Sequence, residues 1–164
     1  MGLRIPFQQK IGAGLTIEHF DEKVKAGLLR HVGLTESMQL IAAGVGWRLD
    51  RTDDNVDPVI ACDKVTTPDL TIEPGMALGV NQIGRGFVGG EEVITLVFRA
   101  AVGEPNPRDR ILIQGSPTVD TTIDKGINGD IATCAIVVNA IPTVVGAAPG
   151  LRTMADIGLI SCVA

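Results

Sequence analysis

The sequence predicts an α+β domain in which a mostly antiparallel, mixed sheet carries helices packed on one face. Two amphipathic helix patterns lie in the first third of the chain, a series of strand-like segments follows, and a long apolar run closes it. The 164 residues are enough for a single domain with a true core, so we expect one domain over residues 1–164.

The first predicted helix begins after the glycine-spaced loop Lys10–Thr16, with the Thr16 hydroxyl as its cap. Its apolar residues recur at helical spacing, and Gly27 ends it: they are Ile17, Phe20 and Val24. A second helix is expected from Thr35, with Glu36 in the first turn, where the helix dipole favours negative charge. Its apolar face would hold Met38, Ile41, Ala42 and Val45.

From Trp47 the apolar spacing changes to two, which predicts strands. We expect a short strand at 47–49, an interruption over the polar residues 50–57, and another strand at 58–62. Four longer segments then begin at residues 76, 91, 109 and 118, separated by GG, GEPNP and SP, which is typical of an antiparallel meander. The alternation in residues 96–101 makes one face apolar and the other only partly polar, so a partner subunit is expected on the second face.

The run from Asp130 to Ala147 is the most apolar stretch of the chain. Periodicity does not separate helix from strand here, but its length, Asp130 as a cap and Gly146 as a stop favour a helix that is buried on almost every face. Pro142 lacks the N–H that would bond to Val138, so the helix is expected to kink or restart there. Asn139 inside this run needs a hydrogen-bond partner, either backbone or substrate.

Composition excludes several classes of function. The formal net charge of −5 and the shortage of aromatic residues argue against nucleic acid and anionic membranes. No apolar run is long enough to span a bilayer and no signal peptide is evident, so we expect a cytoplasmic protein. Three scattered cysteines fit neither a disulfide framework nor a zinc site, and no metal is expected.

Residues 84–89, GRGFVG, match the dinucleotide pattern GxGxxG. The residues that follow are strand-like rather than helical, so we interpret the motif as a hairpin and expect no dinucleotide site in this chain.

The loop from Lys10 to Thr16 combines a lysine, two glycines that expose backbone amides and a hydroxyl at a helix start, which are the parts of a carboxylate site. The alternative is a flexible connector with an ordinary Thr cap. If the two N-terminal helices pack side by side with the same polarity, their free amides meet at one end of the domain. His31, Glu36 and Ser37 would then join the loop in one cleft, with Glu36 receiving an ammonium group; otherwise Glu36 and Ser37 cap a helix and His31 is an ordinary surface or core histidine.

Three segments carry a resemblance to a known family, namely 4–20, 31–47 and 137–157, of which GLTES and NAIP…APGLRTMAD are the most specific. They resemble the carboxy-terminal domain of 2,4-diaminopentanoate dehydrogenase and its relatives in the dihydrodipicolinate reductase superfamily. The resemblance implies a dihydrodipicolinate reductase C-terminal-domain-like fold that binds substrate and builds the oligomer. It also implies a separate N-terminal Rossmann domain that binds NAD(P), which is absent from this chain, so the chain resembles one part of a larger dehydrogenase.

In the reductases a loop K-x-D-x-P-S-G-T supplies a catalytic lysine and a carboxylate-binding Ser-Gly-Thr. Lys10 and the turn at Gly14–Thr16 match its place, whereas Phe7, Gln8 and Gln9 stand where the reductases carry paired histidines. The resemblance therefore implies a substrate-binding and oligomerisation domain of an NAD(P)-dependent amino acid or diamino acid dehydrogenase, inactive by itself, that assembles as a homodimer or homotetramer through the sheet. The alternative is a stand-alone ligand-binding or assembly module. The resemblance implies Lys10 as the catalytic residue and Gly14, Leu15 and Thr16 as carboxylate contacts. The arguments from the residues themselves add further candidate substrate contacts, namely Gly12, His31, Glu36, Ser37 and Asn139.

Overall fold

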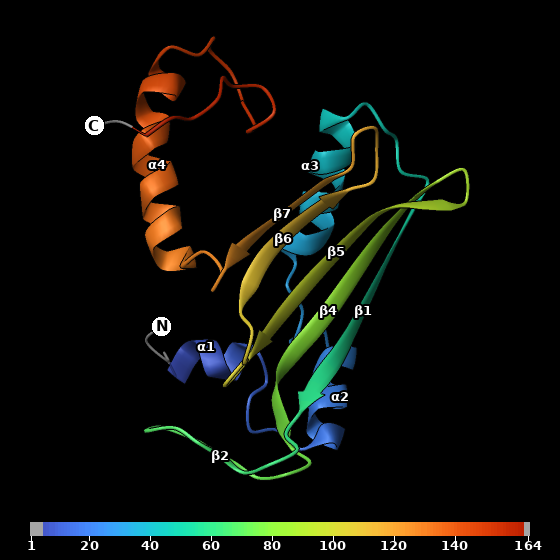
Figure 1. The fold of residues 1–164 in the computed structure, drawn as a ribbon, viewed down its shortest axis with the longest axis vertical. Helices are drawn as coiled ribbons and strands as arrows, with labels where there is room; N and C mark the ends of the chain where they lie inside the picture. The colour runs from blue at the N-terminus through green and yellow to red at the C-terminus, as the bar shows by residue number, and fades with distance from the viewer. Residues whose placement is uncertain (1–4, 163–164) are drawn as a thin grey trace. The chain divides into compact units, whose positions relative to one another are not determined.

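The computed structural model describes residues 5–162, and their side chains from Phe7 onward. The chain divides into two compact units, Gly2–Glu104 and Pro105–Ala164, and each is described by itself. The first unit holds three helices and five strands, and the second holds two strands and one helix (Figure 1).

The helices of the first unit are α1 (Ile5–Lys10), α2 (Ile17–Lys25) and α3 (Gly33–Gly44). Thr16 caps α2 as predicted, because its side chain accepts from the His19 amide at 3.4 Å. Helix α3 begins at Gly33, two residues before the predicted Thr35, and its cap residue Val32 makes no side-chain capping hydrogen bond. Helix α1 was not predicted, because only six residues form it.

The main sheet has the strand order β1–β4–β5, and both pairings are antiparallel, so the predicted α+β fold is confirmed. Its strands are β1 (Arg51–Ile60), β4 (Ala77–Val88) and β5 (Glu91–Ala101), and the short strands β2 (Val65–Thr66) and β3 (Thr71–Ile72) form a separate ladder.

Strand β1 corrects the sequence prediction at this point, because it runs without a break through the polar residues that were expected to interrupt it. Residues 47–49 precede the strand rather than forming one. The physical reason is that β1 is an edge strand, where polar side chains can face solvent and Pro58 needs no ladder partner for its nitrogen.

The GxGxxG segment lies in β4 and in the hairpin that leads to β5. Gly89 and Gly90 have φ values of +61° and +85°, which suits a tight two-residue turn between antiparallel strands. Gly84 and Gly86 instead lie within the strand, where a Cβ on Gly84 would sit 3.0 Å from Leu34 Cδ2. These two glycines let side chains approach the sheet closely and do not form a phosphate loop.

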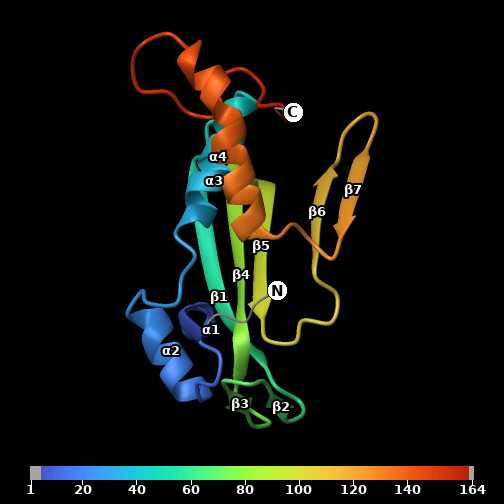
Figure 2. The ribbon, with the colours of Figure 1, turned by 90° about the vertical axis from the view of Figure 1, so that its left-hand side faces the viewer.

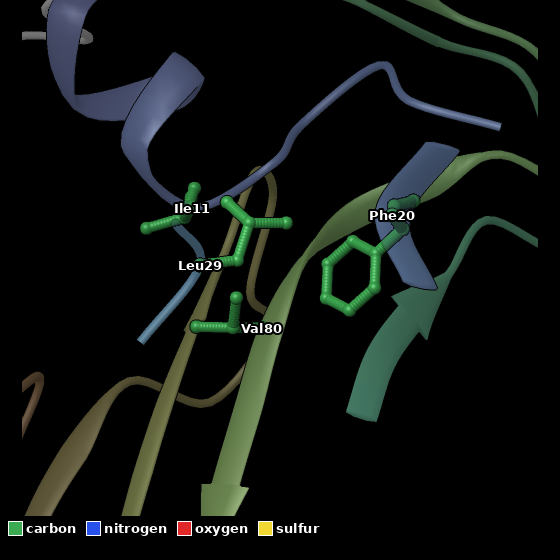
Figure 3. Close-up of a cluster of buried hydrophobic side chains, with 5 residues drawn as sticks. Ile11, Phe20, Leu29 and Val80 are labelled. Carbon is green, nitrogen blue, oxygen red and sulfur yellow. The ribbon is translucent and has the colours of Figure 1, made fainter. Parts of the chain in front are cut away.

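The helices cover one face of the main sheet. Phe20 of α2 packs with Ile11, Leu29 and Val80 in a buried cluster (Figure 3). Further along the sheet, Met38 and Ala42 of α3 pack against Ile94, with Leu49, Val93 and Leu96 partly buried around them. The alternation expected in residues 96–101 is confirmed here, because Leu96, Phe98 and Ala100 pack on these clusters while Val97 is 62% exposed.

The second unit contains the hairpin of β6 (Arg108–Ile113) and β7 (Val119–Asp124), followed by α4 (Gly129–Val145). Strands β6 and β7 form their own two-stranded sheet, so the single meander predicted from residue 76 is wrong. Residues 103–107 are too rich in Gly and Pro to continue the ladder.

The predicted apolar helix is present as α4, with three corrections. Its cap is Asn128, whose side chain accepts from the amides of Asp130 and Ile131, because Asp130 lies inside the first turn. The helix continues through Pro142 to Val145 without restarting, since a missing donor so near the end costs only one bond. Taken by itself, α4 buries none of its residues, so the predicted burial is not achieved within its own unit.

Candidate functional site

The loop between α1 and α2 is held tightly by main-chain hydrogen bonds. Gly14 donates to the Ala77 carbonyl at 2.8 Å and Ala77 donates back to the Leu15 carbonyl at 2.9 Å, which ties the loop to the start of β4. The amides of Gly12 and Ala13 donate to carbonyls of α1. Gly12 and Gly14 both have positive φ, and a Cβ on Gly12 would meet Leu29 and Phe20 at 3.0 Å. The glycines therefore serve a rigid turn, and the amides of Gly12, Gly14 and Leu15 are already engaged inside the fold.

The start of α2 already holds a carboxylate from the chain itself. The pKa of Glu18 is lowered by its own backbone amide and by the Thr16 hydroxyl. An incoming substrate carboxylate at Thr16 would have to compete with this side chain for the same donors.

Lys10 ends α1 with an exposed side chain. Two residues before it, Gln8 is only 3% exposed, and its side-chain nitrogen is buried without a hydrogen-bond partner. Lys10 is thus exposed to solvent, and the same short helix carries an unsatisfied buried donor on another side.

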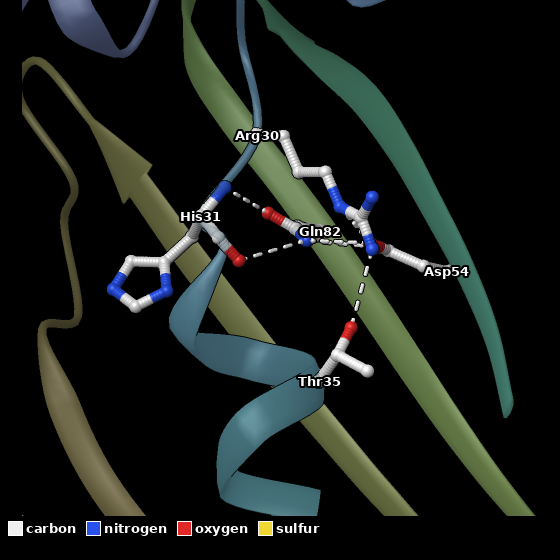
Figure 4. Close-up of polar contacts among 5 residues, drawn as sticks. All are labelled: Arg30, His31, Thr35, Asp54 and Gln82. Atoms are coloured by element: carbon white, nitrogen blue, oxygen red, sulfur yellow. Dashed lines mark hydrogen bonds and ion pairs between the residues drawn. The ribbon is translucent and has the colours of Figure 1, made fainter. Parts of the chain in front are cut away.

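His31 lies in a different part of the unit, where its main chain meets the buried side chain of Gln82 (Figure 4). The His31 amide donates to Gln82 Oε1 at 2.7 Å, and Gln82 Nε2 donates to the His31 carbonyl at 3.3 Å. The imidazole packs on Phe98, with ring centroids 4.6 Å apart. Its position is therefore set by main-chain bonding and ring packing.

Sequence reasoning missed the polar network around Gln82. Gln82 Nε2 donates to both oxygens of Asp54, at 2.8 and 3.0 Å, and Arg30 Nε lies 2.6 Å from Asp54 Oδ2. Arg30 also donates to the Thr35 hydroxyl at 3.2 Å, which links the network to α3. A surface hollow of about 400 Å³ opens beside it, lined in part by Lys25, Arg30 and Asp54. The sequence feature that could have pointed to this network is Gln82 itself, a glutamine among apolar residues of a predicted strand.

The two halves of the predicted cleft lie apart along β4. The Lys10–Thr16 loop bonds to Ala77, whereas His31 bonds to Gln82, five strand residues further on and so about 17 Å away. Helices α2 and α3 follow one another along the sheet, so the expectation of side-by-side packing is wrong (Figure 2). The cause is that residues 26–32 run along the sheet and place α3 over Gly84 and Ile94.

Glu36 and Ser37 lie in the exposed first turns of α3. Asn139 belongs to α4 in the second unit and is partly buried. Within residues 5–162 no group of three or more metal-ligating side chains is assembled. Among the same residues, no helix has the length and apolar character to cross a bilayer.

Comparison with known proteins identifies the family of the chain. Residues 6–164 match the 2,4-diaminopentanoate dehydrogenase C-terminal domain. The chain belongs to this family. It is 32% identical over 153 residues to a 2,4-diaminopentanoate dehydrogenase of Acetoanaerobium sticklandii, an alignment that spans 89% of this chain and 43% of that protein.

The fold of the family member described here is also that of a larger solved protein. The structure of an amine dehydrogenase from Mycobacterium smegmatis superposes with a TM-score of 0.77 at 20% identity, covering 94% of this chain and 47% of that one. The chain thus spans less than half the length of both relatives.

Proposed function

We propose that this domain is the substrate-binding part of an NAD(P)-dependent amino acid or diamino acid dehydrogenase. The observation that carries the proposal is the family match over residues 6–164, together with 32% identity to a 2,4-diaminopentanoate dehydrogenase. The first unit supplies no dinucleotide loop at its GxGxxG segment, because Gly84 and Gly86 are packed beneath Leu34 and Leu49. The nicotinamide cofactor would therefore be held by a part of the enzyme outside this chain.

Lys10 is the proposed catalytic residue, as a proton-transfer group or as the partner of the substrate carboxylate. Its support is its exposure at the end of a helix whose following loop is rigid, which fixes where the ammonium group can reach. Thr16 offers a second polar group in the same loop region. Glu36 lies with α3, beyond the about 17 Å that separates the loop from His31 along β4, so a five-carbon diamino acid bound at Lys10 would not reach it.

Titration calorimetry of the 164-residue chain with 2,4-diaminopentanoate tests the binding role. We expect measurable binding, a loss of about tenfold or more in Lys10→Met, and partial retention in Lys10→Arg, which keeps the charge. Lys23→Met is the matched control, because it removes an exposed lysine from the last turn of α2. No heat with the diamino acid, or equal affinity in the two methionine variants, would contradict the proposal. The chain alone should not reduce NAD+ or NADP+, whereas the full polypeptide that carries this domain should.

We further propose assembly as a homodimer or homotetramer through the open face of the main sheet. That face carries Ile83 opposite Val97, with Asp53, Arg85 and Arg99 around them. An apolar centre with charges of both signs at its rim suits a second copy of the same surface. Val97→Glu should lower the mass measured by light scattering, and an unchanged mass would count against this face.

A further inference from the structure

The hollow beside the Gln82 network has a volume of about 400 Å³ and plays no part in the proposed function. Its walls come from the last turn of α2, the segment that follows this helix and a stretch of β1, so all of them belong to the first unit. Pockets for small molecules begin at about 300 Å³, so a metabolite-sized ligand fits it. The side chains of the lining decide which class of ligand suits the hollow.

One wall of the hollow is the Arg30 guanidinium, which the fold holds in place. Arg30 Nε lies 2.6 Å from Asp54 Oδ2, and Arg30 Nη2 donates to the Thr35 hydroxyl at 3.2 Å. Neither contact uses the remaining nitrogen, Nη1, which points away from Thr35 (Figure 4). The Arg30 side chain is 46% exposed. The fold therefore fixes a cation and leaves it two N–H donors for a group outside the network.

The second cation of the lining is Lys25, whose exposed side chain lies in the last turn of α2. The end of a helix carries a partial negative charge on its free carbonyls, which would oppose an anion. Here the amides of residues 26–28 donate to the carbonyls of Glu22, Val24 and Lys23. These hydrogen bonds satisfy carbonyls that a free helix end would expose, and so weaken that opposition.

Asp54 is the acidic side chain of the lining, and its charge is compensated inside the fold. Its two oxygens accept from Gln82 Nε2 at 2.8 and 3.0 Å, and Arg30 pairs with it. The side chain is only 14% exposed. The lining thus combines the two cations Lys25 and Arg30 with one carboxylate, a net charge of +1. An anion suits such a hollow better than a cation.

The rest of the lining includes an apolar surface formed by Val24, Leu29 and Val56. Leu29 is 2% exposed, and the two valines are partly buried against the same core cluster, so this surface is fixed by packing. Inorganic anions such as phosphate would gain nothing from it. A carboxylate with a short branched hydrocarbon chain would gain both the charged hydrogen bonds and apolar contact.

We propose that the hollow binds a small monocarboxylate whose short apolar chain lies on Val24, Leu29 and Val56. Arg30 Nη1 and the Lys25 ammonium donate to its carboxylate. Because Arg30 also holds Thr35, the bound ligand links the end of α2 to the start of α3. The residue after Arg30, His31, bonds to β4 about 17 Å from the loop that follows Lys10, so this site is separate from the proposed catalytic one.

Methyl NMR of the 164-residue chain, titrated with isobutyrate, tests the proposal. The methyl signals of Val24, Leu29 and Val56 should shift and saturate at millimolar isobutyrate, whereas that of Leu15, in the loop after Lys10, should not shift. Isobutyramide has the same shape without the charge, and its affinity should be at least about tenfold lower. Shifts confined to Leu15, equal affinities for the acid and the amide, or no saturable shift with isobutyrate would each overturn the inference.

Two lysine variants provide the matched pair. Lys25→Met should weaken isobutyrate binding by about threefold or more, because it removes one of the two donors. Lys23→Met removes a lysine from the same turn of α2 that does not line the hollow, and its affinity should equal that of the parent chain. Neither lysine belongs to the Gln82 network, so both variants should keep the fold. Equal losses in the two variants would show that isobutyrate responds only to net charge, and would overturn the proposal.

Discussion

Gln82 closes a pair of hydrogen bonds with the main chain of His31, accepting from its amide at 2.7 Å and donating to its carbonyl at 3.3 Å. The side chain of Gln82 is 1% exposed, so both bonds are shielded from water. They fix the segment between α2 and α3 to the central strand, 51 residues away in sequence. The spacing between the two helices, and hence between Lys10 and Glu36, depends on this contact.

Replacing Gln82 by methionine should therefore lower the free energy of unfolding by about 2–4 kcal/mol, because it leaves the main-chain groups of His31 unsatisfied and removes a donor to the Asp54 carboxylate. Urea denaturation measures this loss. Asn81→Met is the matched control on the opposite face of β4, and its change should stay within about 0.5 kcal/mol. Equal stabilities for the two variants would show that the contact is dispensable.

The parts of the fold that could be predicted from sequence are those decided by local chemistry. Thr16 before an apolar helical pattern gave α2, and Gly89-Gly90 between two alternating segments gave the β4–β5 hairpin. The sequence prediction missed features that depend on tertiary structure. Strand β1 looks like a loop because its polar residues are tolerated only at a sheet edge, and edge position is a tertiary property.

The candidate site likewise combines features that local sequence predicts with features that depend on tertiary structure. The exposed position of Lys10 follows from its place at a helix end. The Gly14 amide, however, donates to the carbonyl of Ala77, far along the chain, and the Leu15 carbonyl accepts from the Ala77 amide. The Gln82–Asp54 network joins residues 28 positions apart, and no spacing rule connects them. Side-by-side packing of α2 and α3 was a prediction about tertiary arrangement, and it is wrong because residues 26–32 place α3 further along the sheet.

Gly84 should resist substitution more than Gly44, although neither has a positive φ. A Cβ on Gly84 would lie 3.0 Å from both Leu34 Cδ2 and Met38 Cε, so Gly84→Ala should cost about 1–3 kcal/mol as α3 is pushed from the sheet. At Gly44, the last residue of α3, an added Cβ meets nothing within 4 Å, and alanine should be neutral or stabilise by up to about 1 kcal/mol. Thermal unfolding of the two variants compares them directly; the reverse order would mean that α3 does not seat on β4 here.

Glu18 should titrate below the ordinary range of a glutamate, because its own amide and the Thr16 hydroxyl favour the charged form. A lowered folded-state pKa stabilises the fold at pH values above the unfolded value near 4.3, and this contribution is lost as the pH falls through the lower folded value. NMR titration of the Glu18 carboxyl checks the direction, with Glu22 in the same helix as an internal reference. A pKa for Glu18 at or above that of a model peptide would contradict the capping interaction.

The same contact gives a prediction for ligand binding. If the substrate carboxylate uses Thr16, Glu18→Gln should tighten binding of 2,4-diaminopentanoate, since it removes the competing charge while keeping the side-chain shape. Glu22→Gln, which removes an equal charge from the exposed part of α2, is the control for net charge. Calorimetry should separate the two variants; weaker binding in Glu18→Gln would mean that Glu18 assists the ligand instead of competing with it.

Replacing Gln8 by methionine should not lower the free energy of unfolding. Gln8 is 3% exposed, and its side-chain nitrogen is buried without a hydrogen-bond partner. Such a nitrogen costs about 1–3 kcal/mol relative to a satisfied donor. Methionine has a similar length and no donor, so Gln8→Met should leave the free energy of unfolding unchanged or raise it by about 1 kcal/mol. Gln82→Met is the internal contrast, because the same substitution there removes satisfied bonds and should be clearly destabilising. If the amide of Gln8 instead serves a substrate, Gln8→Met should combine intact stability with weaker binding of the diamino acid. Denaturation and calorimetry on one preparation therefore separate a tolerated buried amide from one retained for a ligand, and a loss of stability in Gln8→Met would refute both.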